Sequence, residues 1–329
     1  MRKKVFLDKK KIVILGTGGT IAGVAASASD HIGYSAAQLG IDQLVAAVPA
    51  LVDGPCELLT EQLAQVDSKD MTFDVWTRLA ERVSHYLAQA DVQGIVITHG
   101  TDTLEETAWF LQALLAPDKP VVLTCAMRPA TALAPDGPQN LLDAVVVAAH
   151  PGACGVLAVC AGVVHGAMEV QKVHTYRLNA FSSGDAGPLA YVEPGGLRVL
   201  RNWPVAHTDQ AQKAIKNIAT LKEGRHWPRV DIVMSHAGAD GAVVRALVAD
   251  GVQGLVVAGT GNGSLHHALE SALLQAQAAG VRVLRATRCV EGRVLSQPGA
   301  ALLDSQGLSP VKARVSLLLA LLAAPGAPI

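Results

Sequence analysis

The sequence has few aromatic residues, almost no net charge and no long hydrophobic run, and each shortage excludes a class of protein. Phe, Trp and Tyr make up 4% of the 329 residues although half of all residues are hydrophobic, so Ala, Val and Leu must fill the cores. The 27 basic residues do not exceed the 28 acidic ones, whereas a nucleic-acid partner requires a basic surplus. No apolar run reaches the ~20 residues of a membrane-spanning helix. We therefore expect a globular protein, long enough for two domains, without nucleic-acid or membrane partners.

Signals of secretion and of metal binding are also scarce. The five cysteines are odd in number and form no C-x-x-C pair, which favours free thiols in a reduced compartment. They are Cys56, Cys125, Cys154, Cys160 and Cys289. The apolar segment 12–15 is too short for the hydrophobic region of a signal peptide, so we expect a cytoplasmic protein. The adjacent His266 and His267 would diverge on a helix and no H-E-x-x-H motif occurs, so neither a metal nor a cofactor is expected.

A glycine-rich stretch follows the first apolar segment. Residues 12–15 are apolar and partly β-branched, which predicts a buried strand, and glycines 16, 18 and 19 predict a sharp turn. Thr20 then stands at the carboxyl end of that strand, where open α/β sheets bind their ligands. The glycine spacing matches neither G-x-G-x-x-G nor a P-loop, so a nucleotide site is the weaker of the two interpretations of this turn.

A second stretch, residues 94–107, repeats the design of a short strand, a polar turn and a helix. It places Thr101 and Asp102 at the end of its strand, as the first stretch places Thr20. Two hydroxyls and a carboxylate suit acyl transfer, because one hydroxyl can attack a carbonyl while open backbone N–H groups stabilise the oxyanion. Taken alone, Thr101 and Asp102 are better interpreted as the cap of a helix.

The two stretches carry a resemblance to a known family. The segments 17–23 (Thr-Gly-Gly-Thr-Ile-Ala-Gly) and 98–107 (Thr-His-Gly-Thr-Asp-Thr-Leu-Glu-Glu-Thr) resemble the two signature motifs of bacterial-type L-asparaginases and glutaminase-asparaginases. Residues 126–129, 136–140 and 259–263 are also similar to that family. The resemblance covers nearly the whole chain. It implies hydrolysis of L-asparagine to L-aspartate and ammonia through an acyl-threonine intermediate, with a dual glutaminase-asparaginase as the close alternative.

The resemblance also implies catalytic roles. Thr20 would be the nucleophile and Tyr34 its base, because a threonine hydroxyl is weak without one. Thr101 would hold a second reacting oxygen, with Lys172 nearby as the proton acceptor, since a desolvated lysine can lose its proton near neutral pH. Asp102 would accept the α-ammonium of the substrate. Without the resemblance, Thr20 would be interpreted as a loop residue and Lys172 as a surface charge.

Substrate binding and assembly are implied in the same way. Ser68 would bind the α-carboxylate of the substrate, and Ser264 would reach the site of a neighbouring subunit. The implied assembly is a homotetramer made of two dimers, and the implied partner is a small molecule, asparagine or also glutamine.

The sequence departs from the family at two places. Lys69 follows the substrate-loop serine, where relatives usually carry Gln or Glu, and a cation there opposes the α-ammonium. Lys69 could pair with Asp67 or Asp70, swing to solvent, or bind the α-carboxylate. Relatives also supply a glutamate from the adjacent subunit that orients the tyrosine. Residues 288–298 offer no clear counterpart, since Glu291 lies earlier than expected.

Alternating strands and helices predict a parallel sheet in each of two domains. We expect a larger N-terminal α/β domain (residues 1–200), a linker with a short helix (201–229) and a smaller C-terminal α/β domain (230–329), each with a mainly parallel sheet flanked by helices. The expected strands are 12–15, 56–63, 95–97, 121–125, 156–160, 232–235, 255–258 and 281–284. The expected helices are 35–48, 72–88, 104–115, 136–149, 242–249, 264–279 and 310–323. We also expect a flexible loop over 22–33 and hairpins over 163–200.

Two functions from other classes remain open at this level. The chain could be a non-catalytic amino-acid-binding sensor on the same scaffold, or it could bind a nucleotide through the first glycine-rich turn. Release of ammonia would separate the hydrolase from both, and a nucleotide-induced rise in melting temperature would favour the last.

Overall fold

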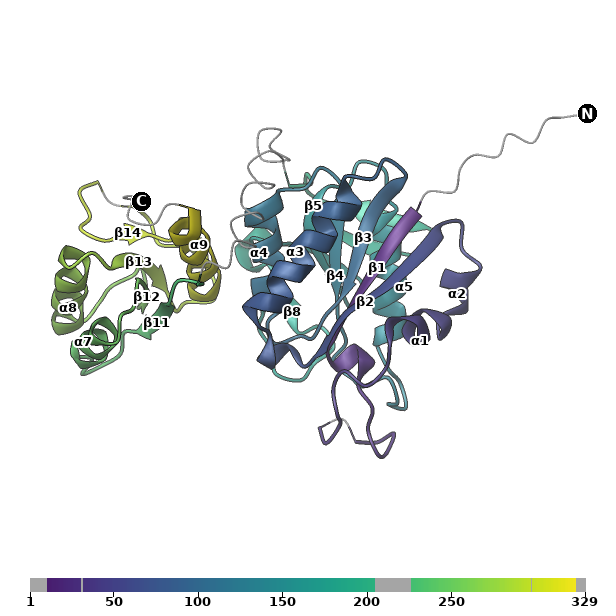
Figure 1. The fold of residues 1–329 in the computed structure, drawn as a ribbon, viewed down its shortest axis with the longest axis horizontal. Coiled ribbons are helices and arrows are strands. Elements are labelled where there is room, and N and C mark those ends of the chain that lie inside the picture. The colour runs from purple at the N-terminus through teal and green to yellow at the C-terminus, as the bar shows by residue number, and fades with distance from the viewer. Residues whose placement is uncertain (1–10, 31, 205–225, 297, 324–329) are drawn as a thin grey trace, which may run out of the picture. The chain divides into compact units, whose positions relative to one another are not determined.

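The computed structural model describes residues 11–30, 32–204, 226–296 and 298–323. Within them the chain forms two compact units, each built on its own sheet (Figure 1). The first unit holds the chain up to Ser183 and again from Gly187, and the second holds Gly184–Ala186 and the C-terminal segment from Val230. The expected class, two α/β units of which the N-terminal one is larger, is confirmed.

The sheet of the first unit has eight strands in the order β10-β9-β6-β5-β4-β3-β1-β2. Its parallel part consists of β1 (Lys11–Gly18), β2 (Glu57–Val66), β3 (Val92–Thr98), β4 (Pro120–Thr124) and β5 (Gly155–Cys160). The antiparallel extension consists of β6 (Val163–Gly166), β9 (Ala190–Glu193) and β10 (Gly196–Val199). Because β1 and β3 are neighbours and parallel, the ends of both motif strands lie at the same edge of the sheet.

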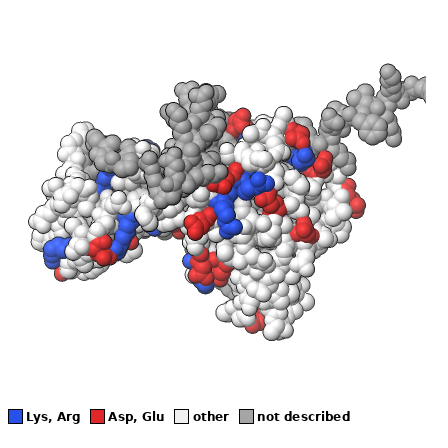
Figure 2. All heavy atoms as spheres, in the orientation of Figure 1, with Lys and Arg blue, Asp and Glu red and all other residues white. Residues whose placement is uncertain are grey.

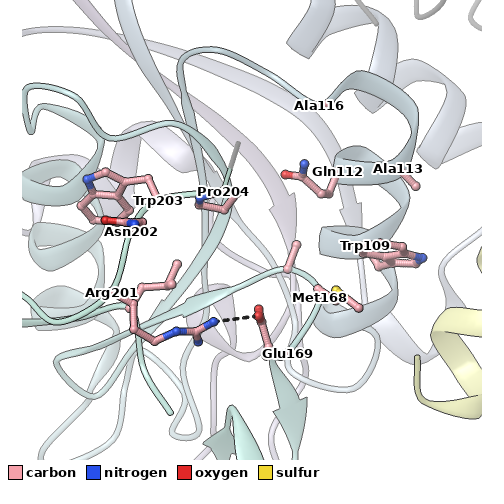
Figure 3. Close-up of a pocket in the computed structure, with 12 residues that line it drawn as sticks. Trp109, Gln112, Ala113, Ala116, Met168, Glu169, Arg201, Asn202, Trp203 and Pro204 are labelled. Atoms are coloured by element: carbon pink, nitrogen blue, oxygen red, sulfur yellow. Dashed lines mark hydrogen bonds and ion pairs between the residues drawn. The ribbon is translucent and has the colours of Figure 1, made fainter. Parts of the chain in front are cut away.

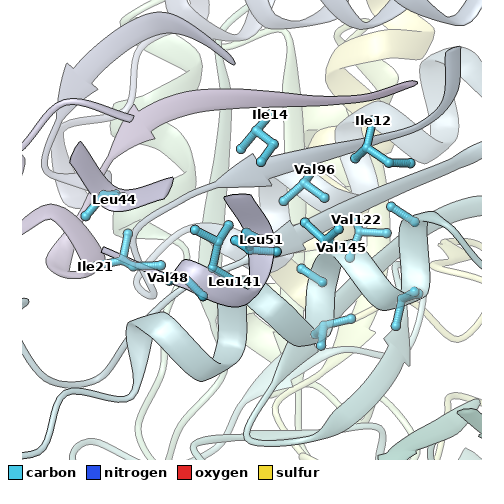
Figure 4. Packing of buried hydrophobic residues seen from close by; sticks show 14 of the residues in the cluster. Ile12, Ile14, Ile21, Leu44, Val48, Leu51, Val96, Val122, Leu141 and Val145 are labelled. Atoms are coloured by element: carbon cyan, nitrogen blue, oxygen red, sulfur yellow. The ribbon is translucent and has the colours of Figure 1, made fainter. Parts of the chain in front are cut away.

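Helices cover both faces of this sheet. In Figure 1, α3 (Phe73–Leu87) and α4 (Leu104–Leu115) lie on one face, and α1 (Ile41–Ala46), α2 (Pro49–Val52) and α5 (Gly137–Ala148) lie on the other. Ile12 and Ile14 project together from β1 because strand side chains alternate, and they join one core with Val96, Val122 and Leu141 (Figure 4). Coverage on both faces explains why β1 is a continuous apolar run rather than an alternating one.

Most helix bounds follow the predictions to within a few residues, and the largest difference concerns the helix expected over 35–48. Thr72 caps α3 by accepting the N–H of Val75, and α4 spans the predicted residues. Of the helix expected over 35–48, only the middle part is confirmed, as α1 (Ile41–Ala46). Ser35 instead forms an antiparallel bridge with Val24, and the helical residues begin only after Gly40. Tertiary pairing therefore overrides an amphipathic pattern here.

The region 163–200 forms short antiparallel strands, as expected, including β7 (Gln171–Lys172) and β8 (Phe181–Ser182), which pair with each other. Most of the expected linker, residues 205–225, lies outside the described residues, and so does the short helix expected there. Basic and acidic side chains are interspersed on the face drawn in Figure 2. No helix within the described ranges is long and apolar enough to cross a membrane.

The second unit has a four-stranded parallel sheet in the order β11-β12-β13-β14. The strands are β11 (Val230–Met234), β12 (Gly254–Gly259), β13 (Arg282–Thr287) and β14 (Leu303–Asp304), and the helices are α7 (Ala242–Ala249), α8 (His267–Ala278) and α9 (Pro310–Ala323). The two-residue β14 was not predicted because it is too short for a pattern. The helix expected from Ser264 begins later, because Ser264 pairs with Thr260 in a tight turn.

Candidate active site

Glycines bring the two motif loops into direct contact. Gly18 and Gly19 have φ angles of +106° and +82°, which side chains other than glycine rarely adopt. A Cβ on Gly19 would lie 2.4 Å from the backbone nitrogen of Gly100, and a Cβ on Gly100 would lie 2.4 Å from the hydroxyl oxygen of Ser68. Only glycine fits at both positions, so the loops that follow β1, β2 and β3 pack against one another.

Thr20 and Tyr34 meet at the first loop. Their hydroxyl oxygens are 2.7 Å apart, and Thr20 is buried at the start of a short 3₁₀ turn (Thr20–Ala22). Tyr34 returns to this position because Val24 and Ser35 exchange two backbone hydrogen bonds of 2.9 Å each. The bridge that displaces the predicted helix therefore places the tyrosine beside the threonine. The prediction that residues 22–33 act as a flexible loop stays a prediction.

Lys172 joins both polar residues of the second loop. Its amine donates to the hydroxyl of Thr101 at 2.8 Å and to the carboxylate of Asp102 at 2.6 Å. Thr101 is buried, whereas the carboxylate side of the pair is half exposed, with 51% of the Asp102 side chain accessible. The structure thus gathers a hydroxyl, an amine and an accessible carboxylate at the end of β3.

Ser68 is buried beneath this loop. Its hydroxyl accepts the N–H of Asp102 at 3.1 Å, and its carbonyl accepts the hydroxyl of Thr103 at 2.8 Å. A hydroxyl that accepts one hydrogen bond keeps its own proton to donate, so Ser68 can also bind an anion.

Lys69 takes the first of the three arrangements considered from the sequence. Its amine pairs with the carboxylate of Asp70 and lies 3.9 Å from that of Asp67, while 60% of its side chain is exposed. The hydrogen bond that Lys69 donates to Asp70 raises the pKa of Lys69, and the charges of Asp67 and Asp102 contribute in the same direction. The lysine charge therefore acts on the same Asp102 carboxylate that faces the amine of Lys172.

Asp136 and Asn140 hold the third family-like segment in shape. The Asp136 carboxylate accepts the N–H groups of Met127 and Arg128 at 2.9 and 3.0 Å. The Asn140 amide donates to the carbonyl of Cys125 at 2.9 Å. These side chains bond to backbone groups of the loop between β4 and α5 that have no partner in a helix or strand. We therefore interpret the resemblance of this segment to the family as a structural requirement of the loop.

The remaining candidates lie in the second unit. Ser264 is exposed in the turn after β12, and Glu291 is exposed in the segment after β13. The contact of Ser264 with a neighbouring subunit stays a prediction. Within the described chain, no group of three or more His, Cys, Asp or Glu side chains could hold a metal ion.

A cavity of about 470 Å³ lies elsewhere in the first unit (Figure 3). Trp109, Met168 and Trp203 line it together with an ion pair between Arg201 and Glu169, whose charged atoms are 3.2 Å apart. None of the predicted site residues lines this cavity. The predicted catalytic threonines therefore lie in the loops that follow β1 and β3 and not in this cavity.

Comparison with known proteins identifies the family of the chain. Residues 11–205 match the family described as asparaginase, N-terminal, and residues 229–325 match the glutaminase/asparaginase C-terminal domain. L-asparaginase 2 of Bacillus subtilis is 39% identical over 95% of this chain and 83% of its own, and the glutaminase-asparaginase of Pseudomonas fluorescens is 37% identical over 94% and 86%. The crystal structure of the probable cytoplasmic L-asparaginase from Campylobacter jejuni superimposes with a TM-score of 0.86 at 38% identity, covering 96% of both chains. The chain therefore belongs to the asparaginase family of amidohydrolases.

Proposed function

We propose that the protein hydrolyses the side-chain amide of L-asparagine, with water as the second substrate and L-aspartate and ammonia as products. The observation that carries the proposal is the pairing of two buried threonine hydroxyls with two proton-transferring side chains. Thr20 bonds to Tyr34, and Thr101 bonds to Lys172. Membership of the asparaginase family supports the choice of substrate.

In the first half of the reaction, the Thr20 oxygen attacks the amide carbon while Tyr34 takes the hydroxyl proton and passes its own phenolic proton on towards the leaving nitrogen. Backbone N–H groups of the glycine-bent loop stabilise the negative charge that develops on the amide oxygen. The carbon–nitrogen bond then breaks, the proton passes to the leaving nitrogen, and ammonia departs. An ester between the substrate carbonyl and Thr20 remains.

In the second half, a water molecule attacks this ester. Thr101 holds the water, and Lys172 in its neutral amine form accepts the water proton, which returns to the Thr20 oxygen as the ester bond breaks. Aspartate is released and the enzyme is regenerated. In this assignment, the Thr20–Tyr34 pair forms the ester and the Thr101–Lys172 pair hydrolyses it.

The α-groups of the substrate bind to the same loops. The Asp102 carboxylate receives the α-ammonium group, and the Ser68 hydroxyl donates to the α-carboxylate. Lys69 lies next to this end of the substrate and weakens the attraction between Asp102 and the ammonium group, because two cations then compete for one carboxylate.

Hydrolysis of glutamine is the second candidate activity, since the relatives include proteins named glutaminase-asparaginase. Initial rates of ammonia release on asparagine and glutamine, measured side by side, decide between them. A faster rate on asparagine supports the proposal. Absence of ammonia release from either amide contradicts it and leaves the amino-acid-binding sensor.

The proposed assembly is a homotetramer of two dimers in the cytoplasm, in which Ser264 of one subunit completes the site of another. Its exposure in the turn after β12 makes it available for such a contact. Light scattering at assay concentration tests the assembly, and an active monomer contradicts it. Ser264→Ala in a preserved tetramer should raise KM for asparagine.

A further inference from the structure

His99 lies inside the second motif, between the last residue of β3 and Gly100, and it is completely buried. Both ring nitrogens have partners. Nδ1 is 2.7 Å from the carbonyl oxygen of Gly100, and Nε2 is 2.9 Å from the hydroxyl of Thr107 on α4. The indole N–H of Trp76 on α3 donates to the same hydroxyl at 2.9 Å. A chain of hydrogen bonds thus connects two helices to the motif loop.

The chemistry of these groups fixes the direction of every hydrogen bond in the chain. A carbonyl oxygen only accepts, so Nδ1 of His99 carries a proton and donates to Gly100. The indole of Trp76 only donates, so the Thr107 oxygen accepts from it and directs its own proton to Nε2. Burial lowers the pKa of His99 to about 4, which keeps the ring neutral at ordinary pH. The neutral Nδ1–H tautomer is therefore the one that satisfies all partners.

The Gly100 carbonyl belongs to the same planar peptide as the N–H of Thr101. A hydrogen bond to the Gly100 carbonyl therefore fixes the orientation of the whole peptide. This in turn fixes the direction in which the backbone of Thr101 continues. Gly100 cannot hold the peptide itself, because it has no side chain and a Cβ there would collide with Ser68. His99 supplies the missing side-chain contact from the buried side of the loop.

We propose that His99 is a positioning residue for Thr101. Its Nδ1–H tautomer, selected by the hydroxyl of Thr107 and the indole of Trp76, holds the Gly100–Thr101 peptide so that the Thr101 hydroxyl meets the amine of Lys172. This inference rests on the proposed function, in which Thr101 acts on the reacting water. Trp76 and Thr107 do not touch the substrate, but in this proposal both affect kcat through His99.

Two substitutions of His99 separate positioning from simple filling of the core. The amide nitrogen of Asn reaches the place of Nδ1 and can donate to Gly100, whereas the Gln amide reaches the place of Nε2 and matches the volume of histidine more closely. Positioning predicts that His99→Asn keeps a higher kcat than His99→Gln, with the Gln variant lowered roughly 10- to 100-fold. Core filling predicts the opposite order. The exposed His85 on α3 provides the control, and His85→Gln should leave kcat unchanged.

Thr107 offers a second pair of variants that conserve the fold. Thr107→Val keeps the shape but removes the hydroxyl, and Thr107→Ser keeps the hydroxyl but removes a methyl group. Positioning predicts a lowered kcat for Val and recovery of most of it for Ser, even though Ser packs less well. Equal kcat in the Val variant and the parent, or a Ser variant no better than Val, overturns the proposal.

Neutron diffraction provides a test that does not depend on activity. The inference requires deuterium on Nδ1 of His99 and none on Nε2, and the reverse arrangement overturns it. Failure of this inference is distinguishable from failure of the proposed function. If the parent enzyme releases no ammonia from asparagine, the function fails, whereas an active parent with the wrong order of His99 variants overturns only the positioning role.

Discussion

The amine of Lys172 lies 2.8 Å from the hydroxyl of Thr101, although 71 residues separate them along the chain. Lys172 belongs to β7, a strand of two residues that pairs with β8 in a separate two-stranded sheet and lies outside the eight-stranded sheet. Asp102 completes the arrangement by accepting from the same amine at 2.6 Å. One lysine thus connects the residue proposed to hold water with the residue proposed to bind the substrate ammonium group.

Thr101→Val should lower kcat by about 10³-fold or more, because the variant retains the shape of the side chain but cannot hold a reacting oxygen. Thr101→Ser, which keeps the hydroxyl, is the matched control and should retain most of the activity. Steady-state ammonia release measures both. A Val variant as active as the Ser variant would remove Thr101 from the mechanism.

Lys172→Met should lower kcat and should also remove the rise of kcat with increasing pH that deprotonation of this amine produces, because the amine takes up the water proton only in its neutral form. The measurement is kcat as a function of pH for the parent and the variant, with circular dichroism as the check on folding. An unchanged profile would exclude Lys172 from proton transfer.

Lys69→Gln should lower KM for asparagine and change kcat less, because the lysine affects a contact made in the ground state and the transition state alike. The reason is that a cation near Asp102 competes with the α-ammonium group of the substrate. Lys69→Arg keeps the charge and should leave KM close to that of the parent. A raised KM in the Gln variant would mean that Lys69 binds the α-carboxylate instead.

The buried His99 predicts how stability depends on pH. Its pKa falls from an ordinary 6.5 to about 4 on folding, so the unfolded chain binds the proton more readily. The free energy of unfolding should therefore decrease as the pH falls from about 6.5 towards 4, by about 3 kcal/mol from this group. Denaturant titrations across this range measure the effect. His99→Gln should be less sensitive to pH in the same window, and an equal slope in parent and variant would contradict the assignment.

The sequence contained enough to predict the architecture because the strands are apolar and the helices have caps and amphipathic faces. Thr72 marks the start of α3, and the bounds of α4 were predicted to the residue. The predicted start of the helix at Ser35 was wrong because Ser35 pairs with Val24, a contact that no local pattern contains.

The site could be predicted only as far as the two motifs extend. The glycine turns and the polar residues at two strand ends pointed to Thr20, Thr101 and Asp102. The roles of Tyr34 and Lys172 depended on resemblance, since both approach the site from other segments. The hydrogen-bond chain from Trp76 through Thr107 to His99 could not be foreseen, because it requires the packing of two helices against the second loop.

Turnover by Thr20→Ala tests the account most directly, because Thr20 is the proposed nucleophile and the substitution removes its hydroxyl together with one methyl group. Thr77→Ala is the matched control, since the Thr77 hydroxyl bonds to the Phe73 carbonyl within α3, at 2.9 Å. Ammonia release from asparagine should fall by several orders of magnitude in Thr20→Ala and remain close to the parent rate in Thr77→Ala, while both variants stay folded. A Thr20→Ala enzyme that releases ammonia within about tenfold of the parent rate would contradict the proposed mechanism.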